Sequence, residues 1–339
     1  MNRLKELINE YYELGIPEQI DHEKFYLYSI ITHSTAIEGS TITEIENQLL
    51  FDEGISSGKS IAEQLMNLDL KAAYEKAFQM VERGEDVTVE NLCLLSGKVM
   101  KNTGSSYNTI AGSFNSADGD LRLLNVSAGY GGRSYIAWQK VSERLEKFCD
   151  WLNSKRHEIE EYDLNQIYDL SFEAHYHLVS IHPWADGNGR MARLVMNMIQ
   201  YEAGVPLSVV QKESRAAYIE SLSQSQEEDS PQPFLDFMIH HHISNLEREI
   251  KQYKQTLEND TLNPQNDTLN DTLNRAGKLS SAEKNVLAAI SEDPEVTIEV
   301  IIQKTSLSRA TVNRAIRSMK EKGVLRRIGS KKTGRWEIR

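Results

Sequence analysis

A short stretch of the chain, residues 182–193, gathers the side chains that could handle a phosphate group. It reads His-Pro-Trp-Ala-Asp-Gly-Asn-Gly-Arg-Met-Ala-Arg. Gly187 and Gly189 let the backbone turn its N–H groups toward a concavity, with Asn188 between them. The positive end of a following helix dipole would add to the attraction for an anion. The sequence therefore predicts an anion pocket at this loop.

The charged residues of this stretch divide into separate chemical tasks. Arg190 and Arg193 are three residues apart, so on a helix they share a face and could orient phosphates. Asp186 could hold Mg²⁺, which takes most of its other ligands from water and phosphate. His182 is the one nearby group that titrates close to neutral pH, which makes it the candidate general base. Asn188 and the loop N–H groups would stabilise charge on a phosphate.

Two predicted helices must position this loop. Residues 164–181 have an amphipathic pattern that Pro183 closes, because proline has no N–H to donate. Residues 190–203 place apolar side chains at helical spacing, and Gly204 ends the pattern. The loop would then lie between two helix ends. The alternative is a polar connection between helices in which the aspartate only caps the second helix.

Residues 182–193 resemble the signature of Fic-domain proteins, His-x-Phe-x-Asp/Glu-Gly-Asn-Gly-Arg-x-x-Arg. Trp184 stands where phenylalanine is usual, and both are large apolar anchors. The resemblance spans roughly residues 24–242. It implies a mainly α-helical Fic-type domain with a small β-hairpin flap. It also implies transfer of AMP from ATP, with Mg²⁺, to a hydroxyl of Ser, Thr or Tyr on a target protein.

A second, shorter motif stands near the N-terminus. Residues 34–39 read Ser-Thr-Ala-Ile-Glu-Gly and match Ser/Thr-x-x-x-Glu-Gly/Asn, which in Fic proteins belongs to an inhibitory helix. The resemblance implies that Glu38 pairs with Arg193 and removes it from the γ-phosphate. A bidentate carboxylate–guanidinium pair would have the right geometry. The alternative is an ordinary helix C-terminus capped by Gly39.

Residues 111–135 are rich in Gly, Asn, Ser and Asp, which predicts irregular chain with a short hairpin. In Fic proteins a β-hairpin flap pairs with an extended segment of the target protein by strand addition. We place the flap within residues 120–136, and the alternative is an ordinary exposed loop. Farther along, residues 212–223 are predicted to be helical. There Arg215 and Tyr218 could line a nucleotide pocket, although packing would explain Tyr218 equally well.

Composition divides the chain into three regions. Residues 1–258 read as a helical body that contains the inhibitory motif and the catalytic domain. Residues 259–279 contain repeats of Asn-Asp-Thr-Leu-Asn and are predicted to be a polar linker. Residues 280–339 show three helical patterns followed by two short strands around a Gly-Ser-Lys-Lys-Thr-Gly turn. That order predicts a winged helix-turn-helix domain.

The charge of the chain is unevenly placed. The formal net charge is −12, yet residues 276–339 hold 14 Lys and Arg against 7 Asp and Glu. An acidic body with a basic tail points to duplex DNA as a partner of the tail alone. The candidate contacts are on the third predicted helix, for the major groove, and in the turn between the strands, for phosphates: Arg309, Asn313, Arg317, Lys331 and Lys332. A protein-contact module is the alternative for this domain.

Other features set the expected location of the chain and the rival functions. No run of about 18 apolar residues suits a membrane span, and the charged first residues do not form a signal peptide. Cys93 and Cys149 fit neither a metal site nor a disulfide framework, so we expect a reducing, cytoplasmic setting. One rival is a DNA-binding transcriptional regulator whose Fic-type domain only senses nucleotide. An intact His182 argues against it. Another is a Fic-type enzyme that removes AMP or transfers a different phosphate-linked group. The target protein and the oligomeric state, a homodimer included, stay open.

Overall fold

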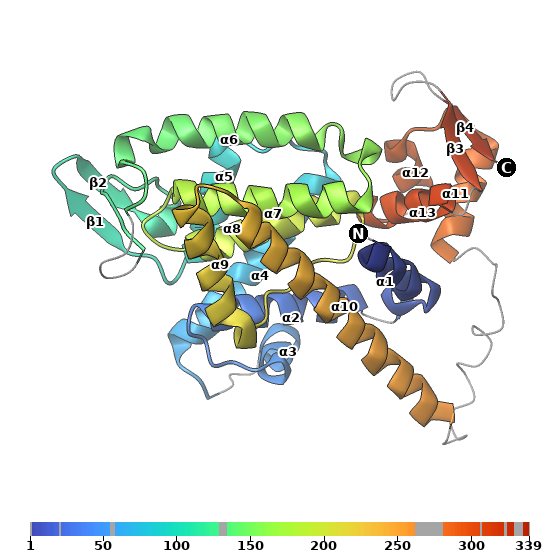
Figure 1. Cartoon of the computed structure of the whole chain (residues 1–339), viewed down its shortest axis with the longest axis horizontal. Coiled ribbons are helices and arrows are strands. Elements are labelled where there is room, and N and C mark those ends of the chain that lie inside the picture. Colours follow the sequence, from blue (N-terminus) through green and yellow to red (C-terminus); the bar gives the residue numbers. More distant parts are fainter. Residues whose placement is uncertain are drawn as a thin grey trace. The chain divides into compact units, whose positions relative to one another are not determined.

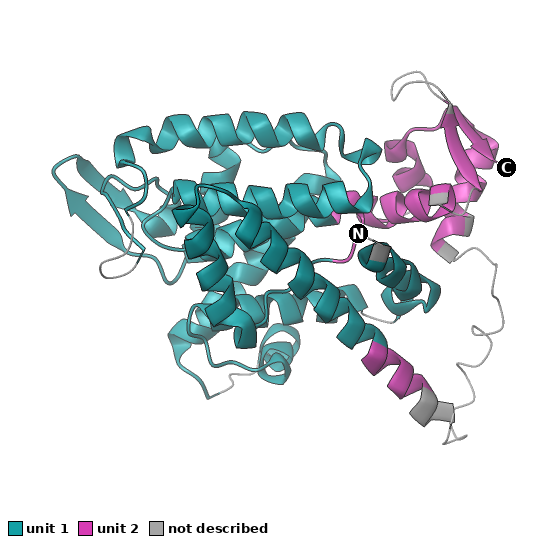
Figure 2. Ribbon diagram, viewed as in Figure 1, with its two compact units in different colours: residues 1–200, 207–250 teal, residues 201–206, 251–339 magenta. Residues whose placement is uncertain are grey.

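The computed structural model describes most of the chain, namely residues 2–19, 22–54, 58–128, 134–261, 281–305, 307–321, 324–328 and 335–338. The chain forms two compact units, residues 1–200 with 207–250, and residues 201–206 with 251–339 (Figure 2). Helices dominate both units, which confirms the predicted fold class. Within the described residues, no helix is long and apolar enough to cross a membrane.

The helices that lie wholly or mostly in the first unit follow one another along the chain (Figure 1). Their bounds are α1 Asn2–Glu13, α2 His22–Ile37, α3 Glu44–Glu53, α4 Ile61–Glu82, α5 Val89–Met100, α6 Val141–Arg156, α7 Leu164–Ile181, α8 Asn188–Ala203, α9 Arg215–Glu227 and α10 Gln232–Thr261. Short 3₁₀ turns join some of them, at Ile16–Glu18, Ser116–Asp118, Trp138–Lys140, Ile159–Glu161 and Lys212–Ser214.

Local sequence signals fix where several of these helices begin. A capping box opens α3 at Thr43, α4 at Ser60 and α7 at Asp163, so that side chains satisfy the first free N–H groups. The helix α7 has the predicted bounds. The helix α8 begins two residues earlier than predicted, because the Met191 N–H already bonds the Gly187 carbonyl at 2.9 Å. The helix α10 reaches Thr261, inside the predicted linker, and residues 262–280 lie outside the described residues.

Residues 182–187, the signature loop, lie between α7 and α8, and both of these helices are deeply buried. Every residue of α8 from Met191 to Gln200 is buried, and most side chains of α7 are buried as well. In the first unit α6 packs along α7 and α4 packs along α5 (Figure 1). The signature loop is therefore held between two helix ends that the core keeps in place.

A small hairpin precedes the position predicted for the flap. Strands β1 Ser106–Thr109 and β2 Gly112–Asn115 pair antiparallel, and the rings of Tyr107 and Phe114 stack across them at 4.8 Å. The predicted range 120–136 holds one antiparallel bridge, Ser127 with Ser134, and residues 129–133 lie outside the described residues. The small hairpin of the predicted fold class is therefore present, but it lies earlier in the chain than predicted, because its strands have four residues each and are rich in Ser, Asn and Gly.

The second unit has its own core. It contains α11 Ser281–Glu292, α12 Ile298–Thr305 and α13 Arg309–Glu321, followed by strands β3 Leu325–Ile328 and β4 Arg335–Ile338, which pair antiparallel. The core joins all of these elements through buried side chains that include Ile290, Ile301, Val312, Met319 and Trp336. This order of helices and strands confirms the winged-helix prediction.

Candidate active site

His182 stands at the C-terminal end of α7 in a left-handed backbone conformation, with φ 52° and ψ 61°. Such a conformation is uncommon for a residue other than glycine. The His182 Nδ1 lies 3.3 Å from the Val179 carbonyl. A proton on Nδ1 would bond that carbonyl and leave the lone pair on Nε2. The imidazole ring stacks on the ring of Tyr135, with ring centres 3.9 Å apart.

Burial lowers the pKa of His182 to about 4. The Val179 carbonyl and Glu38 act in the opposite direction, while the positive charge of Arg122 lowers the pKa further. The imidazole is therefore neutral at pH 7 and able to accept a proton.

Asn188 and Trp184 shape the loop from within. The Asn188 side-chain amide donates to the Trp184 carbonyl at 2.9 Å and accepts from the Trp184 N–H at 3.1 Å. The Trp184 indole is buried and donates to the Gly119 carbonyl at 3.1 Å. Gly187 has φ 81°, and a Cβ there would lie 2.8 Å from the Met100 sulfur. The loop conformation thus depends on glycine at position 187 and on the bonds of the Asn188 side chain to the Trp184 backbone.

Asp186, on the loop, and Arg190, in the first turn of α8, lie near each other. The Asp186 side chain is 58% exposed, and the Arg190 Nη2 is 3.7 Å from its Oδ1. The Arg190 guanidinium is buried against the end of α5, where it donates to the Val99 carbonyl and contacts the Met100 sulfur. Its Nε has no hydrogen-bond partner among the described residues. A buried cation with an unused donor therefore lies close to an exposed carboxylate.

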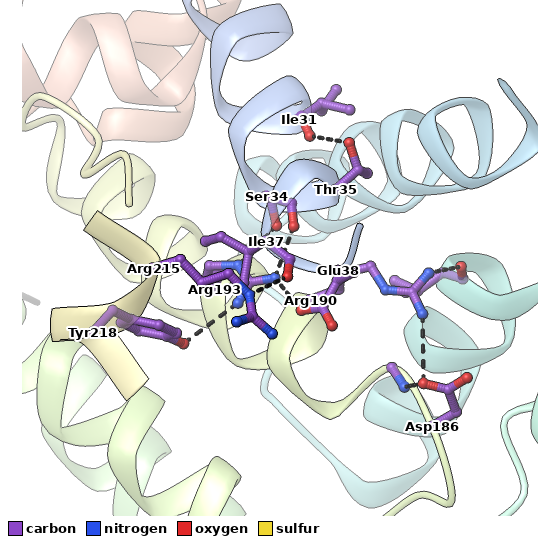
Figure 3. A network of polar contacts seen from close by, with 12 residues as sticks. Ile31, Ser34, Thr35, Ile37, Glu38, Asp186, Arg190, Arg193, Arg215 and Tyr218 are labelled. Carbon is purple, nitrogen blue, oxygen red and sulfur yellow. Dashed lines mark hydrogen bonds and ion pairs between the residues drawn. The ribbon is translucent and has the colours of Figure 1, made fainter. Parts of the chain in front are cut away.

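Arg193 points instead toward α2, where it meets residues of the 34–39 motif (Figure 3). Its Nη2 bonds Glu38 Oε1 at 2.6 Å and the Ser34 carbonyl at 3.0 Å, while its Nε donates to Ser34 Oγ at 2.8 Å. Its Nη1 is 3.4 Å from the Tyr218 hydroxyl. The predicted pairing of Glu38 with Arg193 is present. The pair uses one carboxylate oxygen and not the expected bidentate fork, because Ser34 and Tyr218 take the other donors.

The Glu38 carboxylate lies over the first turn of α8. A Cβ on Gly189 would lie 2.9 Å from Glu38 Oε1. Burial raises the pKa of Glu38, but the positive charges of Arg193, Arg190 and Arg215 outweigh burial, and the net direction is down. An ionised carboxylate thus occupies the helix N-terminus at which an anion is expected.

Residues 86–200 match the model of the Fic/DOC family, and residues 278–335 match the model of the MarR family. The chain is a Fic/DOC domain protein. It is homologous to protein adenylyltransferases, among them fic-1 of Caenorhabditis elegans, at 27% identity over 241 residues. That match covers 70% of this chain and 43% of the relative. The chain spans less than half the length of such relatives.

Solved structures share the fold of this Fic protein. A Fic domain containing signaling protein from Bacteroides thetaiotaomicron is similar with TM-score 0.62 and 22% identity, over 75% of this chain and 98% of that chain. A Fic family protein from Desulfovibrio desulfuricans is similar with TM-score 0.53 and 17% identity, over 100% of this chain and 96% of that one. The latter likeness extends over the MarR-type winged-helix domain as well as the Fic domain.

The helix α9 adds a support for Arg193 that lies outside the matched Fic range. The Tyr218 hydroxyl is 2.8 Å from His175 Nε2, and the side chains of Arg193, Tyr218 and His175 are all buried. Tyr218 therefore both packs in the core and holds the guanidinium. Arg215, the other residue considered for a nucleotide pocket, donates to the Ile37 carbonyl at 2.8 Å and so caps the end of α2.

Two residues beside His182 were not identified from the sequence. Arg122 is buried and bonds the His182 carbonyl, and Tyr135 stacks on the imidazole. Arg122 stands between Leu121 and Leu123, which is a weak sign of a buried arginine. Nothing in that pattern indicates which groups the arginine would bond.

Among the described residues, no cluster of three or more His, Cys, Asp or Glu could hold a metal ion. A single exposed carboxylate at Asp186 still fits Mg²⁺, since this ion keeps waters and binds phosphate oxygens beside one or two carboxylates. The Asp186 carboxylate of the signature loop is therefore compatible with Mg²⁺ bound together with a nucleotide, and not with a metal held by protein ligands alone.

The residues proposed for DNA contact in the MarR-type domain are partly engaged inside the second unit. Arg309 forms an ion pair with Glu299 at 2.8 Å, and the Asn313 amide donates to the Glu202 carbonyl at 2.8 Å. Arg317 is half-buried on the same helix, α13. The remaining two candidates, Lys331 and Lys332, lie outside the described residues.

Proposed function

We propose that this Fic protein transfers AMP from ATP to a hydroxyl group of a target protein and that Glu38 restrains the reaction. The observation that carries the proposal is one loop that joins a neutral imidazole to a helix N-terminus. His182 stands on one side of this loop, and Arg190 and Arg193 follow on the other. The homologous protein adenylyltransferases support the same chemistry.

His182 is the general base in this scheme. Its Nε2 accepts the proton from the hydroxyl of a target Ser, Thr or Tyr, and the hydroxyl oxygen bonds the α-phosphorus of ATP. The bond from the α-phosphorus to the pyrophosphate oxygen breaks, and pyrophosphate leaves with that electron pair. Backbone N–H groups of Asn188 and Gly189 stabilise the charge on the α-phosphate, whereas the Gly187 N–H donates to Asp186 Oδ1 at 2.7 Å. The Asn188 side chain keeps the loop in the conformation that presents these groups.

The rest of the loop binds the remainder of the triphosphate. Arg190 and Arg193 would orient the β- and γ-phosphates. Asp186 would hold Mg²⁺, whose charge offsets that of the departing pyrophosphate. The target segment would dock by strand addition on the flap expected within residues 120–136, of which the described part holds the bridge between Ser127 and Ser134.

Glu38 competes with the nucleotide for the same cation. Its carboxylate bonds Arg193 and lies against Gly189, where the γ-phosphate would otherwise bind. A phosphate cannot reach Arg193 until this carboxylate moves away. Autoinhibition follows from this competition.

The proposal is tested by incubation with ATP labelled at the α-phosphate, in parallel with ATP labelled at the γ-phosphate. We expect Glu38→Gly to incorporate the α label into protein and to incorporate none of the γ label. The double variant Glu38→Gly with His182→Ala should incorporate neither. Incorporation of the γ label would show phosphoryl transfer instead, and equal labelling by the double variant would exclude His182 as the base.

A second function is proposed for the MarR-type domain, namely binding of duplex DNA. The family match and the excess of Lys and Arg in residues 276–339 favour it. Arg326 on β3 is exposed and available to a phosphate. The test of this function is the binding of duplex DNA by the full chain over a series of salt concentrations, and an absence of binding at low salt would contradict it.

A further inference from the structure

Arg122 is a buried cation whose bonds converge on main-chain carbonyls. The residue is 1% exposed. Its Nε donates to the His182 carbonyl at 2.7 Å, its Nη1 to the Leu124 carbonyl at 2.8 Å, and its Nη2 to the Ile136 carbonyl at 2.7 Å. Its own backbone N–H donates to the Pro183 carbonyl at 3.0 Å. One side chain therefore joins the signature loop to both ends of the segment 124–136.

The chemistry of the guanidinium suits this task. Its planar fork carries five N–H donors in fixed directions, whereas an ammonium group is a point charge that could not reach all three carbonyls in the same way. Bonds from a cation are stronger than neutral ones, especially away from water. Burying a charge is costly without full hydrogen bonding, so these three bonds are needed to keep Arg122 in place.

Tyr135 reaches the same imidazole from the other end of the segment. Its ring stacks on that of His182 with an interplanar angle of 18°. Its backbone N–H donates to the Val126 carbonyl at 3.0 Å, which holds the ring in position. The stack covers one face of the imidazole, and the Nδ1 contact with Val179 limits its rotation.

We infer that Arg122 and Tyr135 are positioning residues, which together hold the His182 imidazole with Nε2 directed to the substrate. The left-handed conformation of His182 is a reason for such supports, because an uncommon backbone conformation persists only where its surroundings hold it. Arg122 bonds the carbonyl of that same residue, and Tyr135 holds its ring. The kinetic part of this inference rests on the proposed AMP transfer, whereas the structural part does not.

The test uses the full chain with Glu38→Gly as the parent, and adds Arg122→Lys, Tyr135→Ala or Tyr135→Phe. Matched controls come from elsewhere in the first unit. Arg156 is another buried arginine that bonds a main-chain carbonyl, that of Glu85, and Tyr107 is another stacked tyrosine. The controls are Arg156→Lys and Tyr107→Ala.

Two measurements separate positioning from general stability. The first is the NMR signal of the His182 imidazole across a pH titration without nucleotide. Of the two charged groups near the ring, Glu38 is already absent from the parent, and the variants then alter Arg122 or the Tyr135 ring one at a time. The second is kcat and KM for ATP, with Tm as a check on folding.

We expect Arg122→Lys to lower kcat by about 10- to 100-fold, since small misplacements of a catalytic group have effects of this size. KM for ATP should stay within about twofold of the parent, because uniform binding is not altered. Tyr135→Ala should lower kcat and raise the pKa of His182 toward its ordinary value of about 6.5. Tyr135→Phe should behave as the parent, and the controls should lower Tm alone.

The inference is overturned if Arg122→Lys and Tyr135→Ala leave both the His182 signals and kcat unchanged. It is also overturned if the two control variants shift these signals equally. Should Arg122→Lys fail to fold, Tyr135→Ala and Tyr135→Phe still decide the matter. If the parent transfers no AMP, the proposed function fails, and the imidazole signals alone decide the positioning role.

Discussion

At the scale of the residue, Arg193 is the side chain that both the proposed phosphate contact and the proposed restraint by Glu38 require. Its guanidinium is 3% exposed and is held by Ser34 and Tyr218 as well as by Glu38. Loss of Glu38 would therefore leave the cation in place with a free side for a phosphate. A carboxylate oxygen and a phosphate oxygen can accept from the same guanidinium donors, so a phosphate could replace the Glu38 carboxylate on Arg193.

Replacing Glu38 should raise both ATP affinity and the rate of AMP transfer. Glu38→Gln keeps the size of the side chain and removes its charge, so that Arg193 can bind the γ-phosphate. Energetic coupling within one protein typically changes a ligand's affinity by about 5- to 150-fold, and we expect a change in that range. The measurements are the Kd of ATP and the initial rate of label transfer at saturating ATP and Mg²⁺.

The matched control is Glu44→Gln, because Glu44 is another carboxylate near α2 but bonds Ser29 and His33. It should leave both quantities unchanged. A Glu38→Gln protein of normal Tm with an unaltered rate would mean that Glu38 only ends a helix.

The pH profile should report the state of His182. In the proposed mechanism the neutral imidazole is the base. Its pKa is about 4, so the rate should be flat near pH 7 and fall as the pH drops through about 4. The sign follows because the protonated ring cannot accept a second proton. The measurement is kcat/KM from pH 8 to pH 4 with Tm recorded at each pH. A midpoint near 6.5 would contradict the buried environment of the ring.

At the scale of the element, the end of α2 is tied to α4 through a buried amide. Thr35 Oγ1 donates to Asn67 Oδ1 at 2.7 Å, and Asn47 Nδ2 donates to the same oxygen at 2.8 Å. Asn67 Nδ2 donates to the Glu63 carbonyl at 2.8 Å and to Ser40 Oγ at 3.2 Å. Residues on both sides of Glu38 are thus anchored to one side chain.

Asn67→Ala should weaken the fold and the restraint together. It leaves buried partners without hydrogen bonds, at a cost of about 1–3 kcal/mol in the free energy of unfolding. We expect Tm to fall by roughly 2–4 °C per kcal/mol, and AMP transfer to rise because Glu38 is held less firmly. Asn153→Ala is the control, since Asn153 bonds both main-chain groups of Val87 far from the motif. It should lower Tm without raising the rate, and an equal rise in both variants would refute the link.

Whether a signal is local to one element or depends on distant residues decides which parts of the fold and the site could be predicted from the sequence. Long periodic segments such as α7 were predicted with their observed bounds, because helical spacing and caps are local signals. The pairing of Glu38 with Arg193 was predicted because the short motif around Glu38, weak by itself, stands in one chain with the long signature and in the order that Fic proteins have. The role of Arg122 was not, since it bonds carbonyls of residues as distant as His182. Every residue has a main-chain carbonyl, so residue types do not indicate which carbonyls a side chain bonds. Such contacts can be identified only from the folded structure.

At the scale of the whole molecule, the basic excess lies in the part of the chain that has its own winged-helix core. Residues 276–339 carry 14 Lys and Arg against 7 Asp and Glu, while the chain as a whole has a net charge of −12. The described core of the second unit is built from its own helices and strands. Attraction to a polyanion would therefore arise locally, against repulsion from the acidic remainder.

The full chain should bind duplex DNA weakly at physiological salt and more tightly as salt is lowered. Each phosphate contact contributes a slope of about −0.9 to the dependence of log K on log salt, because bound counterions are released. Arg326→Ala, which removes an exposed cation on β3, should reduce that slope by about one and weaken all sequences alike. Arg317→Ala on α13 should weaken binding and, if that helix enters the major groove, also reduce the preference between sequences.

The control is Lys147→Ala, which removes an exposed cation on α6 of the Fic body and should change neither the affinity nor the salt slope. Anisotropy titrations over a series of salt concentrations measure these effects for all three variants. A protein that shows no DNA binding at low salt, with both units folded, would make the MarR-type domain a module for protein contacts.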